Sequence, residues 1–302
     1  MNGIIIINKP KSFTSFDVIA VLRRLLNQRK IGHMGTLDPM ATGVLPILLG
    51  DSAKFQIYSN NHDKTYVADL KFGITTDTLD ITGNILSETK SSVNREELKK
   101  VLKTFIGEIF QVPPMFSAIK IKGQKLCDLA RKGVEIEREK RKITIYDINL
   151  IDFNEENQTA KIEVACSKGT YIRTLCDDIG QKLSVGAVLT ELRRTKSNGF
   201  DITDSITLDS IRSVCENNGE KNFILPTDML FKDMSSVNVS ERQANRLYNG
   251  ASLDVSRVRF DRKVSDQEIL KVYMNNIFVG LAKVVEEKNE FRALKCEHNF
   301  EF

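Results

Sequence analysis

Apolar runs of strand length alternate with stretches of helical spacing along the first third of the chain. Ile4 to Ile7 is a β-branched run followed by a polar turn, which predicts a buried strand. Thr14 to Asp17 has the form of a helix-capping box, and apolar residues follow it at helical spacing as far as Leu26. Val44 to Leu49 is a second short apolar run. This third of the chain therefore combines strands with a helix.

The middle of the chain continues the mixture of strands and helices. "KTYVADLKFG" predicts a strand, and the Thr- and Asp-rich "ITTDTLDITG" after it predicts an exposed loop. Asn94 caps a predicted helix that Gly107 ends. Two long strands and a further helix, which follows "SKGTYIRTL", are predicted beyond it. The two strands are expected at Lys142 to Phe153 and at Thr159 to Ser167.

A change of pattern falls near Asp233 to Val237. Beyond it, short strand-like pieces such as "ILKVYM" and "IFVGLAKVV" are separated by turns. About seventy residues of this kind predict a small β-barrel attached to the larger part. We therefore divide the chain into residues 1–233 and 234–302, within an α+β fold.

Composition places the chain among ordinary globular proteins: of 302 residues, 41% are hydrophobic and 28% are charged. The longest apolar runs are too short to span a bilayer, and the chain starts with a strand instead of a signal peptide, so a cytoplasmic location without a membrane partner is predicted. The five cysteines form no C-x-x-C pair and the three histidines are far apart. Both facts argue against a zinc site.

Basic residues gather in a few places although the net charge is only +4. Residues 118–143 carry nine lysines and arginines, and "LRRTK" adds Arg193, Arg194 and Lys196. A charge run alone usually marks a solvated face. Several runs of one sign in a chain of small net charge favour a localised phosphate-binding surface.

Asp38 is the one carboxylate in the loop "GHMGTLDPMATGVLP". An isolated Asp before Pro is most often a turn former. Here small residues flank it on both sides, at Gly35 and Thr36 and again at residues 41–43, so a bulky ligand can approach the backbone closely. We therefore interpret Asp38 as a nucleophile candidate at the bottom of a groove.

A partly desolvated carboxylate needs a cation, and a substrate needs a surface to rest on. Arg173 in "KGTYIRTL" is the candidate partner of Asp38, because a guanidinium keeps its proton and can bind a carboxylate through two parallel hydrogen bonds. Tyr66 in "KTYVADLKFG" offers a flat face on which a nucleobase can stack. A surface arginine and a packed core tyrosine are the structural alternatives.

These residues lie in motifs that resemble the bacterial tRNA pseudouridine-55 synthases, the TruB family. Besides the Asp38 loop, the motifs occur in that family's order and span nearly the whole chain. Ser12 is a departure, because the family commonly has glycine there. The motifs are "INKP", "KTYVADLKFG…TDTLDITG", "PPMFSAIKIKGQKLCDLARKG", "SKGTYIRTLCDDIG" and "LRRTKSNGF".

The resemblance implies a fold and a set of site residues. The fold is a central mixed, mostly antiparallel sheet flanked by helices and loops, with a PUA-like RNA-binding barrel over residues 234–302 and a catalytic domain over residues 1–233. Asp38 becomes the nucleophile, Arg173 its partner, and Tyr66 the residue that stacks on the target base and is the candidate for proton transfer at C5. The remaining implied residues are Tyr171 and Leu192, which line the uridine pocket, and Lys9, His33 and Lys120, which support it or contact the RNA.

The implied reaction converts a specific uridine of the tRNA T loop to pseudouridine after the base has been flipped out. No electrons reach an acceptor, so neither a cofactor nor a metal is needed, and the resemblance suggests a monomer. Attack at C1′, attack at C6 and a glycal route all stay open. So do two other functions: a tRNA-folding chaperone that uses the same cleft, and a relative that works on sites selected by a guide RNA.

Overall fold

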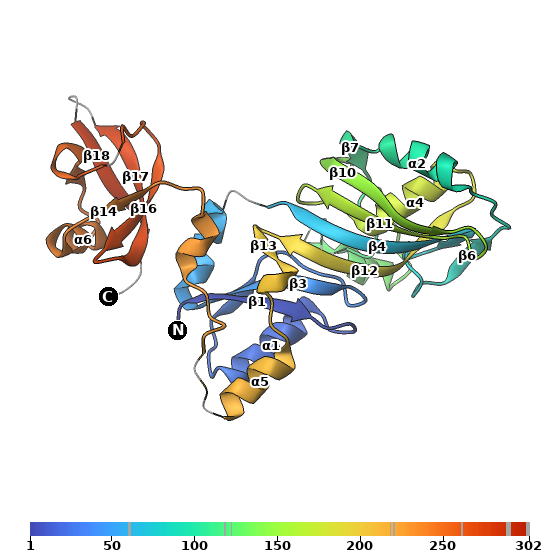
Figure 1. Cartoon of the computed structure of the whole chain (residues 1–302), viewed down its shortest axis with the longest axis horizontal. Helices are drawn as coiled ribbons and strands as arrows, with labels where there is room; N and C mark the ends of the chain where they lie inside the picture. The colour runs from blue at the N-terminus through green and yellow to red at the C-terminus, as the bar shows by residue number, and fades with distance from the viewer. Residues whose placement is uncertain are drawn as a thin grey trace.

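A computed structural model describes residues 1–59, 62–117, 119–121, 123–217, 219, 221–260, 262–287 and 291–299. Figure 1 shows a larger part built on a long twisted sheet and a smaller part that contains the C-terminal strands. Within these residues the larger part holds a nine-stranded sheet with the order β1-β3-β12-β4-β11-β10-β7, to which β2 and β13 add at β3 and β12. The predicted mixed sheet of an α+β fold is confirmed.

The strands of this sheet are β1 (Gly3–Lys9), β2 (Ile31–His33), β3 (Thr42–Leu49), β4 (Lys64–Phe72), β7 (Gly107–Gln111), β10 (Arg141–Asn154), β11 (Thr159–Cys166), β12 (Ala187–Ser197) and β13 (Phe200–Asp201). Two small hairpins join β5 (Ile74–Thr76) to β6 (Ile85–Glu88) and β8 (Lys120–Ile121) to β9 (Gln124–Lys125).

The described α-helices are α1 (Ser15–Leu25), α2 (Arg95–Lys103), α3 (Leu126–Ala130), α4 (Ile172–Lys182), α5 (Leu208–Glu216) and α6 (Glu241–Tyr248). Short 3₁₀ segments are η1 (Gly50–Tyr58), η2 (Ile202–Asp204), η3 (Thr227–Phe231) and η4 (Val255–Arg257). None of the helices in the described part of the chain is long and apolar enough to cross a membrane.

The two halves of the large sheet meet where β3 pairs with β12. This pairing is parallel, and the other neighbours along the sheet are antiparallel. Gly43 lies opposite Arg194 here, and a Cβ on Gly43 would come 2.1 Å from the Arg194 carbonyl oxygen. Only glycine allows this approach, and the φ of +105° also favours it. The Asp38 loop leads directly into this joint.

Local sequence signals explain how two of the helices begin. Thr14 caps α1 in a complete capping box with Asp17, as predicted. Asn94 caps α2 through the Glu97 N–H, also as predicted. Gly107 does not end α2, however. The helix stops at Lys103, and Gly107 starts β7 at a φ of +105°.

The segment "ITTDTLDITG" is only in part the exposed loop that its composition predicts. Asp77, Ile81 and Thr82 are exposed, whereas Thr76 and Asp80 are buried. The Ile81 N–H donates to the Leu189 carbonyl at 2.9 Å, which fastens the loop to β12. Thr and Asp are common in loops because their side chains form hydrogen bonds with the nearby backbone. The same hydrogen bonds satisfy these polar side chains when the loop packs against β12, so Thr76 and Asp80 can be buried.

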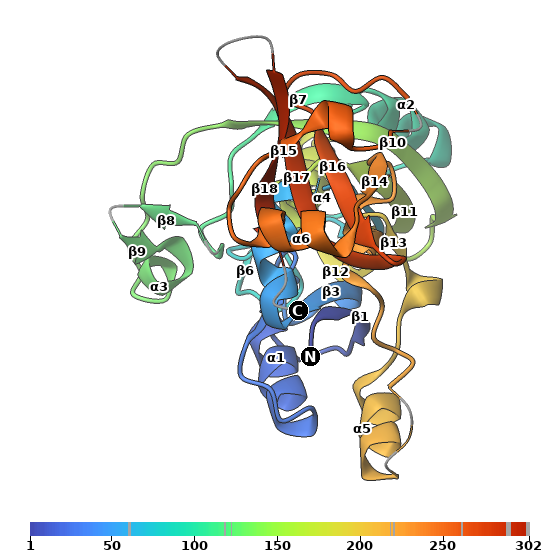
Figure 2. The ribbon, with the colours of Figure 1, turned by 90° about the vertical axis from the view of Figure 1, so that its left-hand side faces the viewer.

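The C-terminal part has its own sheet and its own apolar cluster. Strands β14 (Ser236–Asn238), β15 (Leu253–Asp254), β16 (Ile269–Met274), β17 (Ile277–Glu287) and β18 (Phe291–Asn299) form the order β14-β16-β17-β18-β15. Helix α6 packs beside them, as Figure 2 shows. Phe278 contacts Phe55 of η1 with ring centres 5.7 Å apart, so the two parts touch. The division at residue 233 and the PUA-like nature of this part stay predictions.

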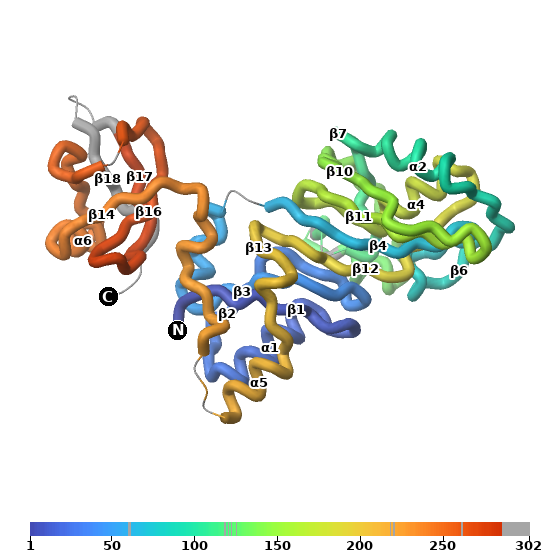
Figure 3. Tube along the Cα trace, in the orientation of Figure 1, coloured from blue at the N-terminus to red at the C-terminus, as the bar shows by residue number. Residues whose placement is uncertain are grey.

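The segment that carries β8, β9 and α3 stands away from the large sheet. Figure 2 shows it at one side of the molecule, whereas the strands β7, β10, β11, β4 and β12 lie next to one another in Figure 3. This segment holds much of the basic run that the sequence predicts as a phosphate-binding surface. It therefore lies beside the sheet and not in its core.

Ser12 → Gly is expected to stabilise the protein. Ser12 has a φ of 68°, where a residue with a Cβ is strained by about 1–2 kcal/mol. Glycine removes that strain but costs roughly 0.5–1 kcal/mol of chain entropy, so we expect a net gain of about 0.5–1 kcal/mol, read as a higher melting temperature. Ser205 → Gly, at a φ of −91°, is the control and should lower it. A lower melting temperature for Ser12 → Gly would contradict the strain argument.

Candidate active site

A pocket of about 410 Å³ lies beside the joint of the two half-sheets. Its lining comes from the Asp38 loop, from the first residues of β4, from β12, from the chain just before and within α4, and from Ser117 and Ile119 before β8. Asp38, Tyr66, Tyr171, Arg173 and Leu192 all line it. Five of the residues that the sequence singled out, from four distant segments, are therefore brought together around one cavity.

The start of α1 holds the Asp38 loop from one side. The Leu37 N–H donates to the Ser15 hydroxyl oxygen at 3.0 Å, and the Ser12 N–H donates to the Pro39 carbonyl at 2.8 Å. Within the loop, the Ala41 N–H donates to the Asp38 carbonyl at 3.0 Å. These backbone bonds fix the loop on both sides of Asp38, so its side chain is presented from a rigid frame.

Arg194 holds the same loop from beneath. Its side chain is fully buried, and its Nε donates to the Val44 carbonyl at 2.7 Å. Nη1 and Nη2 donate to the carbonyls of Thr36 and Gly35 at 3.3 and 3.2 Å. The prediction that Arg194 belongs to an exposed phosphate-binding surface is wrong, whereas its neighbours Arg193 and Lys196 are exposed.

Lys9 is a second buried cation under the loop. Its Nζ donates to the carbonyls of Pro10 at 2.9 Å, Phe13 at 2.5 Å and Pro39 at 3.4 Å, and the residue is fully buried. Burial lowers the pKa of Lys9 to about 8, although the nearby Asp38 opposes this shift. In this position Lys9 supports the loop and does not line the pocket.

Asp38 and Arg173 form an ion pair at the pocket wall. Arg173 Nε lies 3.0 Å from Asp38 Oδ2, and the Arg173 side chain is 5% exposed against 38% for Asp38. The predicted two-pronged contact is not formed. Nη1 donates to the Thr78 carbonyl at 3.0 Å and Nη2 to the Phe116 carbonyl at 2.8 Å. One guanidinium thus joins the loop acid to two other segments.

Asp80 adds a second carboxylate on the far side of this guanidinium. Its Oδ2 lies 3.7 Å from Arg173 Nη1, and its other oxygen accepts from the Thr78 hydroxyl at 2.9 Å and the Thr82 N–H at 3.0 Å. Asp80 therefore helps to hold the orientation of Arg173 while the Nε side stays on Asp38. The burial of Asp80, which the sequence did not predict, places it there.

Tyr66, Tyr171 and Leu192 give the pocket apolar walls. Tyr66 and Leu192 are 6% and 7% exposed. Burial raises the pKa of Tyr66 to about 12, against an opposing effect of the Arg194 guanidinium that hydrogen-bonds to it. Burial also raises the pKa of Tyr171. Its N–H donates to Gln111 Oε1 at 3.0 Å, which anchors the start of α4 to β7.

His33 and Lys120 do not join these residues within what the structure describes. His33 lies on β2 outside the pocket lining, with its ring 5.5 Å from the exposed ring of Phe16 in an edge-to-face contact. Its buried Nδ1 has no hydrogen-bond partner, and burial lowers the pKa of His33. The side chain of Lys120 lies outside the described residues.

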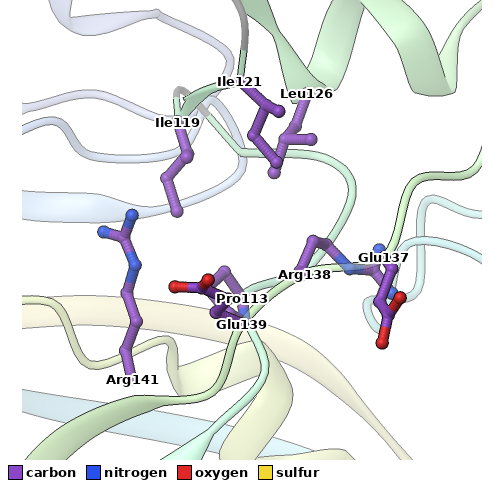
Figure 4. A pocket seen from close by; sticks show the side chains of 8 residues that line it. All are labelled: Pro113, Ile119, Ile121, Leu126, Glu137, Arg138, Glu139 and Arg141. Atoms are coloured by element: carbon purple, nitrogen blue, oxygen red, sulfur yellow. The ribbon is translucent and has the colours of Figure 1, made fainter.

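A second cavity, of about 350 Å³, separates the projecting segment from the start of β10. Figure 4 shows the apolar side chains of Ile119 and Ile121 on one side of this cavity and the charged side chains of Arg141 and Glu139 on the other. Neither Asp38 nor Arg173 lines it. This cavity is not the site of the candidate nucleophile, although Ile119 lines both cavities.

Sequence reasoning missed Arg194, Asp80 and the two lysines that line the main pocket, Lys64 and Lys168. The signal for Arg194 was the period of two along β12, because Leu192 and Arg194 fall on one face of a strand. Lys64 is two residues before Tyr66, so the period of two along β4 likewise places these residues on one face of the strand. Within the residues that are described, no group of three or more His, Cys, Asp or Glu could hold a metal ion.

The sheet and the helices beside it form the pseudouridine synthase fold, which this chain shares with a chain of a Cbf5-Nop10-Gar1 complex, and the fold places the protein in the pseudouridine synthase class of isomerases. The model of the TruB family pseudouridylate synthase N-terminal domain matches residues 23–172, and that of the tRNA pseudouridylate synthase B C-terminal domain matches residues 173–232. The chain belongs to the TruB family.

Curated relatives and solved structures agree with this membership. The tRNA pseudouridine synthase B of Clostridium tetani is 45% identical over 95% of this chain and 97% of its own length. That of Alkaliphilus oremlandii is 42% identical, with 98% and 97% covered. A chain of a Cbf5-Nop10-Gar1 complex is 27% identical with a TM-score of 0.73, and the match covers 99% of this chain and 85% of that one.

Proposed function

We propose that this protein converts the uridine at position 55, in the T loop of tRNA, to pseudouridine, with Asp38 as the nucleophile. Membership in the TruB family supports the isomerisation of a uridine in tRNA. The observation that carries the role of Asp38 is its 3.0 Å contact with Arg173 at the wall of the 410 Å³ pocket. Position 55 is proposed because the motifs of the chain resemble those of the bacterial tRNA pseudouridine-55 synthases. That volume lies within the range of about 300–1,000 Å³ that is typical of ligand sites.

The reacting nucleotide has to leave its loop to reach Asp38. Extrusion of a stacked base costs a few kcal/mol, which stacking and phosphate contacts in the protein offset. Tyr66, Tyr171 and Leu192 provide apolar walls against which the flat face of uracil can rest. Since these walls are held by strands and by the start of α4, the slot is largely formed before the RNA arrives.

Asp38 holds one fragment of the nucleotide while the other turns. Its carboxylate can add to C1′ or to C6, or can assist elimination to a glycal, and all three routes use the same oxygen atoms. Arg173 supplies the compensating charge and sets the direction of the carboxylate. Because its other nitrogens are held by Thr78 and Phe116, the guanidinium cannot follow Asp38 if the loop shifts.

Tyr66 has a clearer part in stacking than in proton transfer. With a pKa of about 12, about one Tyr66 side chain in 10⁵ is a phenolate at pH 7. Removal of the C5 proton by this residue requires the phenolate form, so Arg194, which hydrogen-bonds to the phenol, would have to stabilise the negative oxygen before it takes up that proton. Stacking of the ring on uracil requires no ionisation.

Contacts outside the pocket would hold the rest of the tRNA. The exposed Arg193 and Lys196 lie at the end of β12, and the projecting segment from residue 112 to 140 carries further basic residues. We propose that these contact the T stem-loop and that the C-terminal domain, residues 234–302, adds contacts toward the acceptor end. A monomer is sufficient for this arrangement.

The purified protein is expected to form one pseudouridine in an unmodified tRNA and in an isolated T stem-loop, read by a mass-based assay. Replacement of the target U by C should leave no product, because the nucleotide then carries cytosine in place of the uracil that the reaction rearranges. Product at a uridine outside the T loop would contradict the proposed position. If Asp38 → Asn protein still accelerates tRNA folding, a chaperone activity accompanies the isomerase.

A further inference from the structure

Lys64 is a cation inside the pocket that the proposed chemistry does not use. It is the first residue of β4, paired with Cys166 of β11 and Ser197 of β12. Its stem lies against the Asp38 loop, because a Cβ on Gly35 would come 3.6 Å from Lys64 Cε. Its Nζ donates to the His62 carbonyl at 2.8 Å and makes no ion pair among the described residues.

The other cations around the pocket already have their acceptors. Arg173 is held by Asp38 and two carbonyls, and Arg194 and Lys9 each contact three carbonyls beneath the loop. Lys64 and the exposed Lys168 are the cations of the described lining without such a set. An ammonium has three N–H donors, so Lys64 has two beyond the bond to His62.

The surroundings of Lys64 carry an excess of positive charge. Burial, Arg194 and Lys168 together lower the pKa of Lys64 to about 8, against the opposing effects of Cys166 and Asp63. Asp63 in turn accepts a hydrogen bond from the Tyr146 hydroxyl at 3.0 Å. A bound anion would relieve this excess. The formal negative charges of an RNA substrate are on its phosphates, which an ammonium binds as a point charge.

We propose that Lys64, with Lys168 at the rim, binds the phosphate that flanks the extruded nucleotide. This inference rests on the proposed function, since it takes the nucleotide in the pocket to be part of an RNA. The contact would fix the backbone on the side of the pocket formed by β4 and the residues before α4. It would thereby set how deeply the nucleotide enters toward Asp38.

The test measures binding of a fluorescent T stem-loop by anisotropy, separately from turnover. Lys64 → Met is expected to weaken binding about tenfold at about pH 7, and to reduce the salt slope by about 0.7, the value for one single-stranded phosphate contact. Lys71 → Met, on the exposed side of the same strand, is the control and should leave both quantities unchanged. A methylphosphonate at the linkage beside the target should weaken binding of the wild type but not of Lys64 → Met.

The pH profile gives a second readout that a merely structural role would not move. An ammonium with a pKa of about 8 is charged below that pH, so the affinity of the wild type should fall between about pH 7 and pH 9. Lys64 → Arg stays charged and should bind with less dependence on pH. Lys9 titrates in the same range, and the comparison with Lys64 → Arg isolates the part due to Lys64.

Equal affinities and salt slopes for the wild type and Lys64 → Met would overturn the phosphate contact, even if the protein modifies the RNA. Equal sensitivity of both proteins to the methylphosphonate would overturn it as well. Failure of the proposed function looks different. In that case the wild type yields no pseudouridine from any tRNA, whatever the affinities of these variants.

Discussion

Asp38 → Asn is expected to abolish pseudouridine formation while the fold and the RNA affinity persist. An amide cannot provide the carboxylate that would attack or assist at the sugar, and loss of a nucleophile costs about four or more orders of magnitude in rate. Asn has nearly the same shape, and the backbone bonds at Leu37, Pro39 and Ala41 are not changed. Single-turnover assays on a T stem-loop, with binding and melting measured in parallel, check this.

Asp69 → Asn is the matched control for this substitution. Asp69 pairs with Lys161 at 3.3 Å, and its side chain is 31% exposed against 38% for Asp38. The two carboxylates are therefore alike in exposure and in having a cationic partner, although Lys161 is more exposed than Arg173. Since Asp69 does not line the pocket, its amide variant should turn over normally. A wild-type rate for Asp38 → Asn would remove Asp38 from the role of nucleophile.

Arg173 → Lys is expected to lower the rate by about 10²–10³-fold with little change in RNA affinity. The reason is geometric, because the charge is kept. The guanidinium binds Asp38 through Nε while Nη1 and Nη2 hold the carbonyls of Thr78 and Phe116. A single ammonium nitrogen cannot reach these three directions at once, so Asp38 loses either its partner or its orientation.

Arg95 → Lys controls for the general effect of this exchange. Arg95 also contacts a carbonyl, that of Phe153 at 3.1 Å, and a carboxylate, that of Asp152 at 3.7 Å, but does so at the surface. Its lysine variant should keep the wild-type rate. Near-normal turnover by Arg173 → Lys would show that charge alone suffices at this position and that the three-way geometry is not needed.

Local signals explain most of the elements. The run Ile4 to Ile7 lies within β1, and the capping residues Thr14 and Asn94 begin α1 and α2 as predicted. These features depend on neighbours a few residues away, which the sequence shows directly. The predicted end of α2 is wrong because a glycine with positive φ is found both after helices and at the start of strands. Gly107 is the second case.

Local sequence signals predict only part of the candidate site. Asp38 and Tyr66 stood out through small neighbours and through a strand motif, and they do line one pocket. Arg194 was assigned to the surface because arginines usually lie there. A fully buried arginine is stable only if carbonyl groups receive its protons, and its partners are about 150 residues away in the chain.

The sequence by itself determined where α1 and α2 begin, which loop carries the acid, and the family to which these motifs point. Those properties depend on residue type, spacing and order, which need no third dimension. Only the tertiary structure decided which cations serve the loop and which remain for a ligand. Hydrogen-bond geometry decides which cation is free for a ligand. The residue type is the same whether a lysine or arginine is buried against carbonyl groups or open to a pocket.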